Sequence, residues 1–321
     1  MEPVKLSASS LASVDSCSWI YYAQYVLKIP QSGNVGSYRG TICHLIFNLL
    51  AKEKHEKTRQ AILKAGDPFS CKAIKRLVVQ HMKKVGIGTK ENYELMREMI
   101  LVGFQTVAEY DKVKMLGNEM KFEIKENGYY LKGFIDRLYQ LKDSILVVDF
   151  KSSKAKFPKS ALATNIQAMM YSLAARTLYK AKTSVEFIFL RFPKKPTQEI
   201  AFSDKTLDGF VEYLKYMASY LRDFTMDKAL VNLAAEKYEK RWMCGSLKAG
   251  AWVCPYRKPF KYYGLMNKEG EITKTSLNKL TNKDGLACVE LTYSGCPHHI
   301  NKNNEELYLD FFIKIPYNYN K

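Results

Sequence analysis

The chain has 321 residues, enough to bury one large hydrophobic core or a core with a smaller appended part. Its 50 lysines and arginines against 32 aspartates and glutamates give a formal net charge of +18, which favours polyanionic partners, nucleic acid first. No apolar run reaches transmembrane length, the first residues lack a secretory pattern, and the seven cysteines are odd in number. These features argue against a membrane protein and a disulfide-stapled secreted domain, so we expect a cytoplasmic protein.

Helical periodicity comes first along the chain, then strand-like alternation, then helix again. The pattern predicts early helices over residues 7–27, 40–51, 52–65, 70–84 and 91–115. It then predicts three successive strands over 119–125, 129–141 and 144–151, a helix over 161–180, a strand over 184–192 and a helix over 207–228. This order predicts an α/β fold, with a mixed β-sheet flanked by helices and preceded by N-terminal helices.

The composition changes after about residue 240. Residues 241–300 hold Trp- and Cys-containing clusters separated by Gly, Lys and Asn, with short strand-like runs such as 287–292. We therefore expect a core with its N-terminal helical region over 1–240, and a Cys-containing appendage over 241–321 packed on that core. The apolar stretch 305–315 is expected to pack back on the body as a strand or a helix.

The predicted strands 129–141 and 144–151 carry two carboxylates and an amine. Side chains alternate along a strand, so Asp149 and Lys151 lie on one face, and the hairpin brings Asp136 alongside them. Two buried carboxylates are costly unless a divalent cation lies between them. The pattern predicts a metal site held by Asp136, Asp149 and the carbonyl of Phe150. The alternative is an exposed strand end with ordinary charges.

Such a site suits hydrolysis of a phosphodiester, which needs a deprotonated nucleophile and neutralisation of oxygen charges. Lys151 is placed to orient or deprotonate the attacking water, or to stabilise charge in the transition state. His44 lies in an apolar helix. By itself it is more typical of a core histidine, but two aspartates that need a shared cation favour a ligand.

Other polar residues would complete the site. Gln167 and Tyr171 are four apart on one predicted helix, so they share a face that could hold water and the phosphate backbone. They could equally be polar residues of an amphipathic helix. Lys154 and Lys156 follow the catalytic strand and could track phosphates, although a solvated lysine-rich face is the alternative.

Four short motifs in this order resemble those of RecB-like nucleases of the PD-(D/E)XK superfamily. They are Gly40-x-x-x-His44, Gly133-Phe-Ile-Asp136, Asp149-Phe-Lys151 and Gln167-x-x-x-Tyr171. Relatives include the AddB nuclease domain and the CRISPR-associated adaptation exonucleases. The resemblance implies a restriction-endonuclease-like core and DNA cleavage that depends on Mg²⁺ or Mn²⁺, usually exonucleolytic and on single strands. It implies His44, Asp136 and Asp149 as metal ligands, Lys151 as the catalytic lysine, and Gln167 and Tyr171 as active-site helix residues.

Many of these relatives hold a [4Fe–4S] cluster by one cysteine before the core and three after it. Cys17 matches the upstream position, and Cys244, Cys254 and Cys296 are the downstream candidates. The downstream cysteines are grouped tightly in the family but are spread here, so either insertions open the motif or the cluster is absent. Zinc bound by Cys254, Cys296, His298 and His299 is one alternative. Plain buried thiols are another, and we expect Cys43, Cys71 and Cys288 to be packing residues.

The sequence as a whole thus predicts a metal-dependent exonuclease acting on DNA, with single strands as the expected substrate, within a recombination, replication, repair or adaptation complex. A catalytically inert DNA-binding subunit is the alternative, although the retained Asp136, Asp149 and Lys151 argue against it. An RNA-directed nuclease is a third interpretation that the net charge does not exclude.

Overall fold

The computed structural model describes residues 3–126, 128–246, 252–282 and 285–300. The chain divides into two compact units, residues 1–9 with 33–222, and residues 10–32 with 223–321. Residues 10–32 therefore group with the C-terminal region, and the core unit ends at 222, whereas the sequence placed 1–240 together. The expected segment 305–315 lies outside the described residues.

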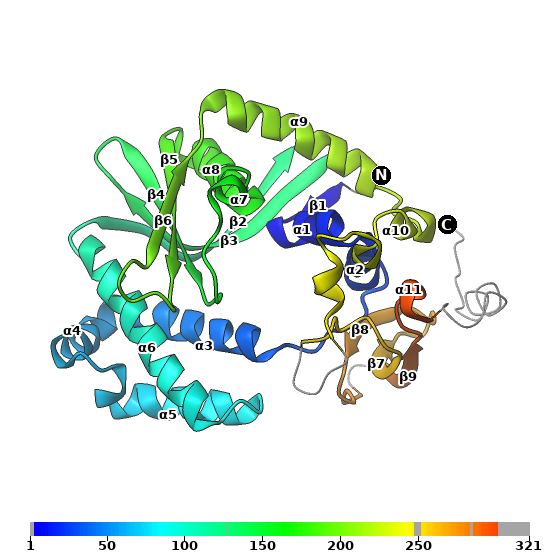
Figure 1. The fold of residues 1–321 in the computed structure, drawn as a ribbon, viewed down its shortest axis with the longest axis horizontal. Helices are drawn as coiled ribbons and strands as arrows, with labels where there is room; N and C mark the ends of the chain where they lie inside the picture. The colour runs from blue at the N-terminus through cyan, green and yellow to red at the C-terminus, as the bar shows by residue number, and fades with distance from the viewer. Residues whose placement is uncertain (1–2, 127, 247–251, 283–284, 301–321) are drawn as a thin grey trace. The chain divides into compact units, whose positions relative to one another are not determined.

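The first unit is built on a six-stranded mixed sheet (Figure 1). Its strands are β1 (Val4–Leu6), β2 (Lys114–Glu126), β3 (Tyr129–Gln140), β4 (Ser144–Lys151), β5 (Lys182–Phe189) and β6 (Thr197–Ala201). β3 pairs antiparallel with β2 along one edge; along its other edge it pairs with β1 at its start and with β4 at its end. β4 pairs parallel with β5, and β5 antiparallel with β6. The predicted α/β fold with a mixed sheet flanked by helices is confirmed.

Helices pack against this sheet. They are α3 (Val35–Leu50), α4 (Glu56–Ala65), α5 (Lys72–Lys84), α6 (Lys90–Val107), α7 (Lys159–Ala163), α8 (Ile166–Tyr179) and α9 (Asp204–Leu221). The main hydrophobic core joins α3–α6 to β3, β4 and β5 through residues such as Phe47, Phe104 and Phe150. α8 contacts β4 and β5, and α9 contacts β1 and α8, on the side labelled α8 and α9 in Figure 1.

β3 and β4 separate next to Asp136 and Asp149, the two aspartates singled out in the sequence. Their ladder runs from Gln140 paired with Ile145 to Arg137 paired with Val148, and no further. The next residues, Asp136 and Asp149, would face each other, but here the two strands part. The backbone N–H of Phe150, released from the ladder, donates to Oδ2 of Asp136 at 2.8 Å. A side chain therefore replaces a strand as hydrogen-bond partner, and the fork leaves room for functional groups.

Several expected element boundaries were wrong. The helix expected over 91–115 ends at Val107, because its last expected residues belong to strand β2, which begins at Lys114. The helix expected from residue 40 begins at Val35, since Asn34 and Ser37 form a capping box. The helices expected over 161–180 and 207–228 are each broken in two, and strands β1 and β6 were missed. Both missed strands are short, which gives periodicity little to detect.

The second unit combines short helices with a small sheet. The helices are α1 (Ala8–Ser16), α2 (Ser18–Tyr21), α10 (Met226–Leu230) and α11 (Pro297–Ile300), and the strands are β7 (Phe260–Met266), β8 (Ile272–Ser276) and β9 (Ala287–Tyr293). The strands form an antiparallel sheet in the order β8-β7-β9. Most of this sheet was not predicted, because only 287–292 had a clear strand pattern.

The helix expected over 7–27 is interrupted at Cys17, whose backbone is extended. Tertiary hydrogen bonds account for the break. The backbone N–H of Ser18 donates to the carbonyl of Asn232 at 3.0 Å, and the Ser18 hydroxyl donates to the carbonyl of Ala229 at 2.7 Å. Farther along, Trp19 Nε1 donates to the Tyr293 hydroxyl at 2.7 Å. Residues 10–32 are therefore fastened to the C-terminal segment, and Cys17 is held at a fixed place within it.

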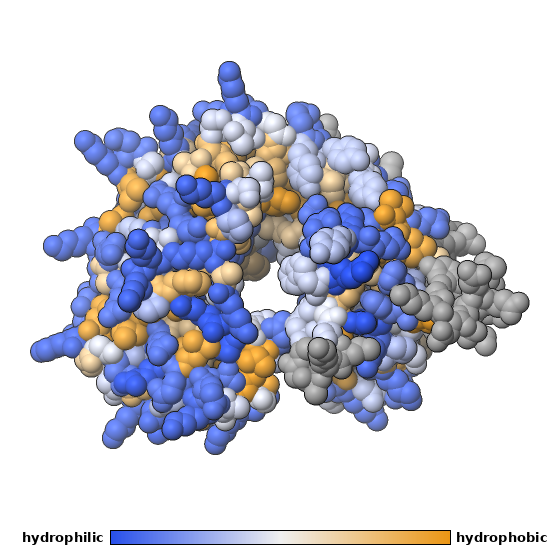
Figure 2. Space-filling model, in the orientation of Figure 1, coloured by the Kyte–Doolittle hydropathy of each residue, from blue (hydrophilic) through white to orange (hydrophobic). Residues whose placement is uncertain are grey.

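Hydrophilic residues cover most of the surface visible in Figure 2, with hydrophobic residues in patches between them. The charge excess thus lies on the outside, while the sheet interior is apolar. In the described part of the chain, no helix is long and apolar enough to cross a membrane.

Candidate active site and cysteine pocket

Asp136 and Asp149 are both buried at the fork between β3 and β4. Oδ2 of Asp136 accepts from the Phe150 N–H, which leaves its Oδ1 facing the site. Burial and then the neighbouring charge of Asp149 raise the pKa of Asp136. A cation beside the two aspartates would offset this and favour the charged form of Asp136.

His44, on α3, supplies an imidazole to the same place. Its Nδ1 lies 3.2 Å from Oδ1 of Asp136, and its Nε2 lies 3.2 Å from the carbonyl oxygen of Phe150. Burial opposes the charged imidazole, but contacts with Asp136 and Glu119 outweigh burial and raise the pKa of His44 to about 10. The protonated imidazole of His44 is therefore the positive charge beside Asp136, and a bound metal ion would take the place of this proton.

Glu119, on β2, is a member of the site that the sequence analysis missed. Its Oε1 lies 3.8 Å from Nδ1 of His44. Ligand atoms of His44, Glu119 and Asp136 all lie within 4.8 Å of one another, the sole such group of three among the described residues. The strand pattern gave no reason to single out one glutamate of several on β2. A weak signal was the preceding Gly117-Asn118 pair, which is typical of a strand irregularity.

Lys151, Gln167 and Tyr171 surround Asp149. Nζ of Lys151 lies 2.7 Å from Oδ2 of Asp149 in an ion pair, although that oxygen receives no well-directed hydrogen bond. Lys151 also donates to Oε1 of Gln167. Oδ1 of Asp149 accepts from Nε2 of Gln167 at 3.0 Å and from the hydroxyl of Tyr171 at 3.1 Å. Burial first, and then the charge of Asp149, raises the pKa of Tyr171, so the phenol stays a donor.

Two features hold the catalytic strands against α3. Arg137, buried next to Asp136, donates to the carbonyl of Phe47 at 3.2 Å and lies over the ring of Phe150. A Cβ built at Gly40 would lie 3.0 Å from Oγ of Ser152, so the early part of α3 approaches the end of β4 closely. The glycine of the Gly40-x-x-x-His44 motif therefore lets the helix that carries His44 reach the strand that carries Lys151.

This donor set fits a hard divalent cation. It offers carboxylate oxygens, one backbone carbonyl and one imidazole, which are the ligands that Mg²⁺ and Mn²⁺ accept. The buried Oδ2 of Asp149 lacks a directed hydrogen bond and is thus available to a metal ion. The structure brings His44, Asp136, Asp149, Phe150, Lys151, Gln167 and Tyr171 together.

The two lysines expected to contact DNA lie outside this network. Lys154 is exposed. The ammonium of Lys156 donates to the backbone carbonyls of Lys195 and Thr197 and lies 5.5 Å from the ring centre of Phe192. Lys156 therefore ties the loop after β4 to the segment after β5, and contact with phosphate stays a prediction for both lysines.

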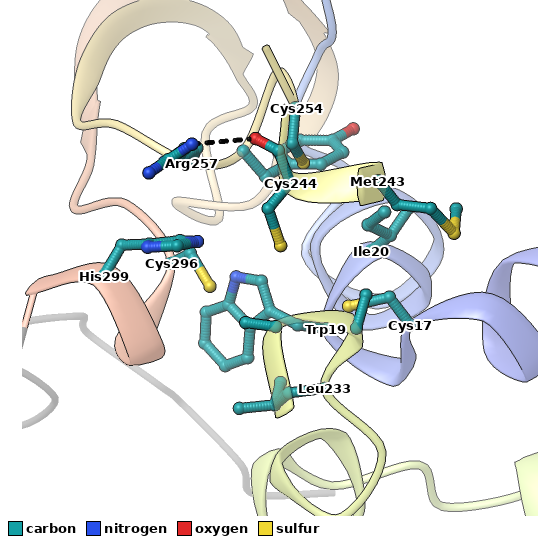
Figure 3. A pocket seen from close by; sticks show the side chains of 13 residues that line it. Cys17, Trp19, Ile20, Leu233, Met243, Cys244, Cys254, Arg257, Cys296 and His299 are labelled. Atoms are coloured by element: carbon teal, nitrogen blue, oxygen red, sulfur yellow. Dashed lines mark hydrogen bonds between the residues drawn. The ribbon is translucent and has the colours of Figure 1, made fainter. Parts of the chain in front are cut away.

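The four cysteines singled out in the sequence line one pocket in the second unit (Figure 3). Cys17 and Cys296 are buried, and Cys244 and Cys254 are partly buried. Figure 3 shows the sulfur atoms of Cys17, Cys244 and Cys296 turned toward the same space, beside the indole of Trp19. Arg257 donates to the carbonyl of Cys244 at 3.2 Å, which fixes that loop. Residues far apart in the sequence thus present thiols to one place.

Burial raises the pKa of the Cys254 thiol to about 11 and that of the Cys296 thiol to about 12. Both thiols therefore stay protonated near neutral pH unless a bound metal compensates the charge of the thiolate. Of the two histidines in the zinc alternative, His299 lines the pocket, whereas Nδ1 of His298 lies 3.6 Å from Oε1 of Glu236.

Comparisons with known proteins agree with this geometry. A profile of the PD-(D/E)XK nuclease superfamily matches residues 5–258. The chain is 26% identical over 166 residues to a subunit of the ATP-dependent helicase/deoxyribonuclease of Streptococcus agalactiae, covering 49% of this chain and 15% of that protein. It is 24% identical over 240 residues to the corresponding protein of Streptococcus uberis, covering 68% of this chain and 21% of that protein.

The chain therefore spans only a small part of the length of these relatives. Among solved structures, one protein from Eubacterium rectale superposes with a TM-score of 0.47 at 13% identity, covering 74% of this chain and 87% of that chain.

Proposed function

This chain belongs to the PD-(D/E)XK nuclease superfamily, and from that premise we propose that it is a divalent-metal-dependent deoxyribonuclease that degrades single-stranded DNA from an end. The observation that carries the proposal is the meeting of His44, Asp136 and Asp149 with Lys151 at the fork between β3 and β4. It costs free energy of folding to hold an amine, an imidazole and two carboxylates together in a partly buried place. Proteins keep such groups together mainly at functional sites.

The residues would divide the work of hydrolysis among them. His44, Asp136, Asp149 and the Phe150 carbonyl would hold Mg²⁺ or Mn²⁺, with Glu119 as an additional ligand. When bound, the cation supplies charge neutralisation at the phosphate and lowers the pKa of water. Lys151, held between Asp149 and Gln167, would orient the attacking water, accept its proton or stabilise the developing charge.

Gln167 and Tyr171 would act through Asp149. Both donate to its Oδ1. These hydrogen bonds leave the other oxygen of Asp149, Oδ2, toward Lys151 and the proposed cation. Since α8 carries both residues and packs on β4, the orientation of this carboxylate is set by the fold.

A cleavage assay tests the proposal. Labelled single-stranded DNA is incubated with the protein and Mg²⁺ or Mn²⁺, beside Lys151→Ala and, as a matched control, Lys84→Ala. We expect cleavage that needs the metal, a loss of at least about a hundredfold in Lys151→Ala and little change in Lys84→Ala, because Lys84 is exposed at the end of α5. Equal activity of the unmodified protein and Lys151→Ala would reject the enzyme. Substrates blocked at the 5′ or 3′ end, circular DNA and RNA of the same sequence then test attack from an end and the choice of DNA.

The second candidate function is a DNA-binding subunit with an inert nuclease fold. The basic charge of the chain would support binding without cleavage. An unmodified protein that binds DNA but leaves it intact with every divalent metal would favour this alternative. The ion pair between the partly buried Lys151 and the buried Asp149 favours the enzyme, because an inert copy has no need to keep both groups.

We also propose that Cys17, Cys244, Cys254 and Cys296 bind a [4Fe–4S] cluster with a structural role. Tetrahedral zinc, with Zn–S bonds of about 2.3 Å, needs its thiolates roughly 4 Å apart. Among the described residues, no three cysteine thiols lie within 4.8 Å of one another. A larger group therefore suits the pocket better than a single zinc ion.

The cellular setting is inferred from the relatives. Those proteins are named as subunits of a helicase/deoxyribonuclease, so we propose that this chain also works on DNA beside protein partners, in recombination, repair, replication or CRISPR adaptation. A reducing cytoplasm would keep the seven cysteines as the free thiols that the structure contains.

A further inference from the structure

Two arginines beside the candidate active site have no counter-ion in the part of the chain that the structure describes. Arg39 lies in the early part of α3, and Arg191 lies two residues after the end of β5. Among the residues that the structure describes, neither guanidinium forms an ion pair with a carboxylate. Nε of Arg39 and Nη1 of Arg191 are both shielded from solvent and have no hydrogen-bond partner there. A buried donor without an acceptor destabilises the fold, so these two donors would gain from an acceptor supplied by a ligand.

The backbone places both arginines around Ser152. Gly40, next to Arg39, lies against Oγ of Ser152, and that hydroxyl is 3.4 Å from the carbonyl oxygen of Gly36. On the other side, the N–H of Leu190 donates to the carbonyl of Lys151 at 2.9 Å, which sets Arg191 next to Ser152. Gly40 and Leu190, the direct sequence neighbours of Arg39 and Arg191, therefore both lie against the end of β4 beside Lys151.

The electrostatics agree with this placement. Burial lowers the pKa of Arg39, and the nearby positive charge of Arg191 lowers it further. Two like charges in a partly buried place disfavour each other, and an anion shared between them would relieve this repulsion. Arg39 has one partner, Oδ1 of Asn92 at 2.9 Å, which is neutral and orients the side chain without compensating its charge.

Arg59 and Arg176 show the contrasting situation. Arg59 also leaves its Nε without an acceptor among the described residues, but it pairs with Asp111 at 3.2 Å and donates to the carbonyl of Leu50. Arg176 pairs with Asp208 at 3.0 Å. Buried Arg137 forms no ion pair in the described part of the chain, but its guanidinium donates to the carbonyl of Phe47 and the hydroxyl of Tyr139.

We propose that Arg39 and Arg191 bind a phosphate group of the DNA substrate beside the scissile bond. The inference rests on the proposed function, and it adds a binding site to it. The planar fork of arginine matches phosphate oxygens in pairs, and two forks suit one phosphate group. The phosphate is either an internal phosphodiester of the strand or a terminal phosphomonoester, whose second charge would match two guanidinium groups.

Equilibrium binding of short oligonucleotides tests the site. Fluorescent oligo-dT with a 5′-phosphate, a 3′-phosphate or neither is titrated in EDTA, which prevents cleavage, and anisotropy gives Kd at several salt concentrations. The variants are Arg39→Gln, Arg191→Gln and the double variant. Arg76→Gln is the matched control, because Arg76 is exposed on α5 and its loss removes the same charge.

We expect each single variant at Arg39 or Arg191 to weaken binding about tenfold. The double variant should lose less than the product of the two, because both arginines hold the same phosphate. The slope of log Kd against log salt should fall by about 0.7 for the phosphate contact that is lost. Arg76→Gln should change Kd far less. A loss confined to oligonucleotides with one phosphorylated end assigns the site to a terminal phosphate; an equal loss for all assigns it to the backbone.

Binding of every oligonucleotide by Arg191→Gln as tightly as by Arg76→Gln, with an unchanged salt slope, would overturn the phosphate site. Arg191→Gln decides the matter alone if Arg39→Gln fails to fold, which circular dichroism would reveal. The two proposals fail separately. If the protein cleaves DNA and the arginine variants bind it unchanged, the nuclease proposal stands and the phosphate site is rejected. If the arginine variants bind DNA more weakly but the unmodified protein does not cleave it, the phosphate site stands and the nuclease proposal is rejected.

Discussion

Glu119 reaches the candidate metal site because its backbone leaves the regular strand conformation. Its φ is +48°, in the left-handed region that residues other than glycine avoid. Holding such a residue there costs about 1–3 kcal/mol, and proteins retain this strain mainly where a side chain must be aimed at a site. The neighbouring Asn118 supports the distortion, since its Nδ2 donates to Oδ1 of Asn48 on α3 at 2.6 Å.

A change of Glu119→Gln should therefore weaken metal binding. Without its negative charge, the site holds one less anionic ligand, and we expect the Kd for Mn²⁺ to rise about tenfold or more. Isothermal titration calorimetry on the metal-free protein measures this directly. Glu123→Gln, an exposed change on the same strand, is the control and should leave the Kd unchanged. Equal affinities for the two variants would remove Glu119 from the site.

Glu186 shows the opposite situation, a buried carboxylate that forms no ion pair with any residue that the structure describes. On β5 it accepts a hydrogen bond from the hydroxyl of Tyr110 at 3.0 Å, and Glu199 of β6 is its strand partner. Burial raises the pKa of Glu186, and the charges of Glu199 and Glu109 raise it further. The folded protein therefore favours the protonated form of this side chain.

The pH dependence of stability follows from this direction. A carboxyl whose folded pKa is raised stabilises the fold fully below its unfolded pKa, near 4.5, and loses that contribution as pH rises through the folded pKa. Glu186→Gln keeps an acceptor for Tyr110 but cannot ionise. We expect it to raise the melting temperature at pH 8 and to make little difference at pH 4. A variant that melts lower than the unmodified protein at pH 8 would contradict this.

At the scale of elements, the site depends on close packing between β2, β3 and α8. A Cβ built at Gly133 of β3 would lie 2.6 Å from Cζ of Phe122 on β2. The ring of Phe122 in turn packs edge-on against that of Tyr171 at 6.3 Å between centroids. The glycine of the Gly133-Phe-Ile-Asp136 motif thus makes room for an aromatic ring that supports the active-site helix.

Gly133→Ala should accordingly destabilise the protein and disturb Tyr171. We expect the free energy of unfolding to fall by about 1–3 kcal/mol, the usual cost of overpacking. Adding Phe122→Leu should recover part of the loss, which denaturant unfolding of the single and double variants measures. Gly209→Ala is the control of opposite sign, because no atom lies within 4 Å of its Cβ and alanine favours helix α9. A harmless Gly133→Ala would show that Phe122 does not need this space.

The elements were predictable where local pattern alone decides them. Strand β4 has the bounds expected from its apolar run, and β3 differs by one residue. His44, Asp136, Asp149 and Lys151, which the motifs singled out, lie close together in the structure because a hairpin and one long helix fix their positions. What escaped prediction depends on tertiary contacts: the bent backbone at Glu119 and the break at Cys17, which residues more than 200 positions away impose.

At the scale of the whole chain, the second unit brings together residues 10–32 and the region from residue 223 onward. Asn232 donates to the carbonyl of Val14 at 2.8 Å, and the hydroxyl of Tyr256 donates to the carbonyl of Ile29 at 3.0 Å. These bonds join residues 10–32 to the C-terminal part around the cysteine pocket. The small β7–β9 sheet offers few fully buried residues, so the proposed cluster, if bound, would stabilise this unit.

Loss of one cluster ligand should therefore unfold this unit at a lower temperature. Anaerobically purified protein should be brown and contain iron and sulfide, whereas Cys17→Ala should be colourless and show a lower first melting transition, because cluster binding stabilises the folded form. Cys288→Ala is the matched control: Cys288 lies on β9 in the same unit but outside the pocket, so its variant should stay brown. Absorption spectra, iron analysis and calorimetry measure these outcomes. If the protein is colourless and contains zinc that is lost in Cys254→Ala, the pocket binds zinc and not a cluster. If the protein contains no metal and Cys17→Ala leaves the melting profile unchanged, the four thiols are packing residues.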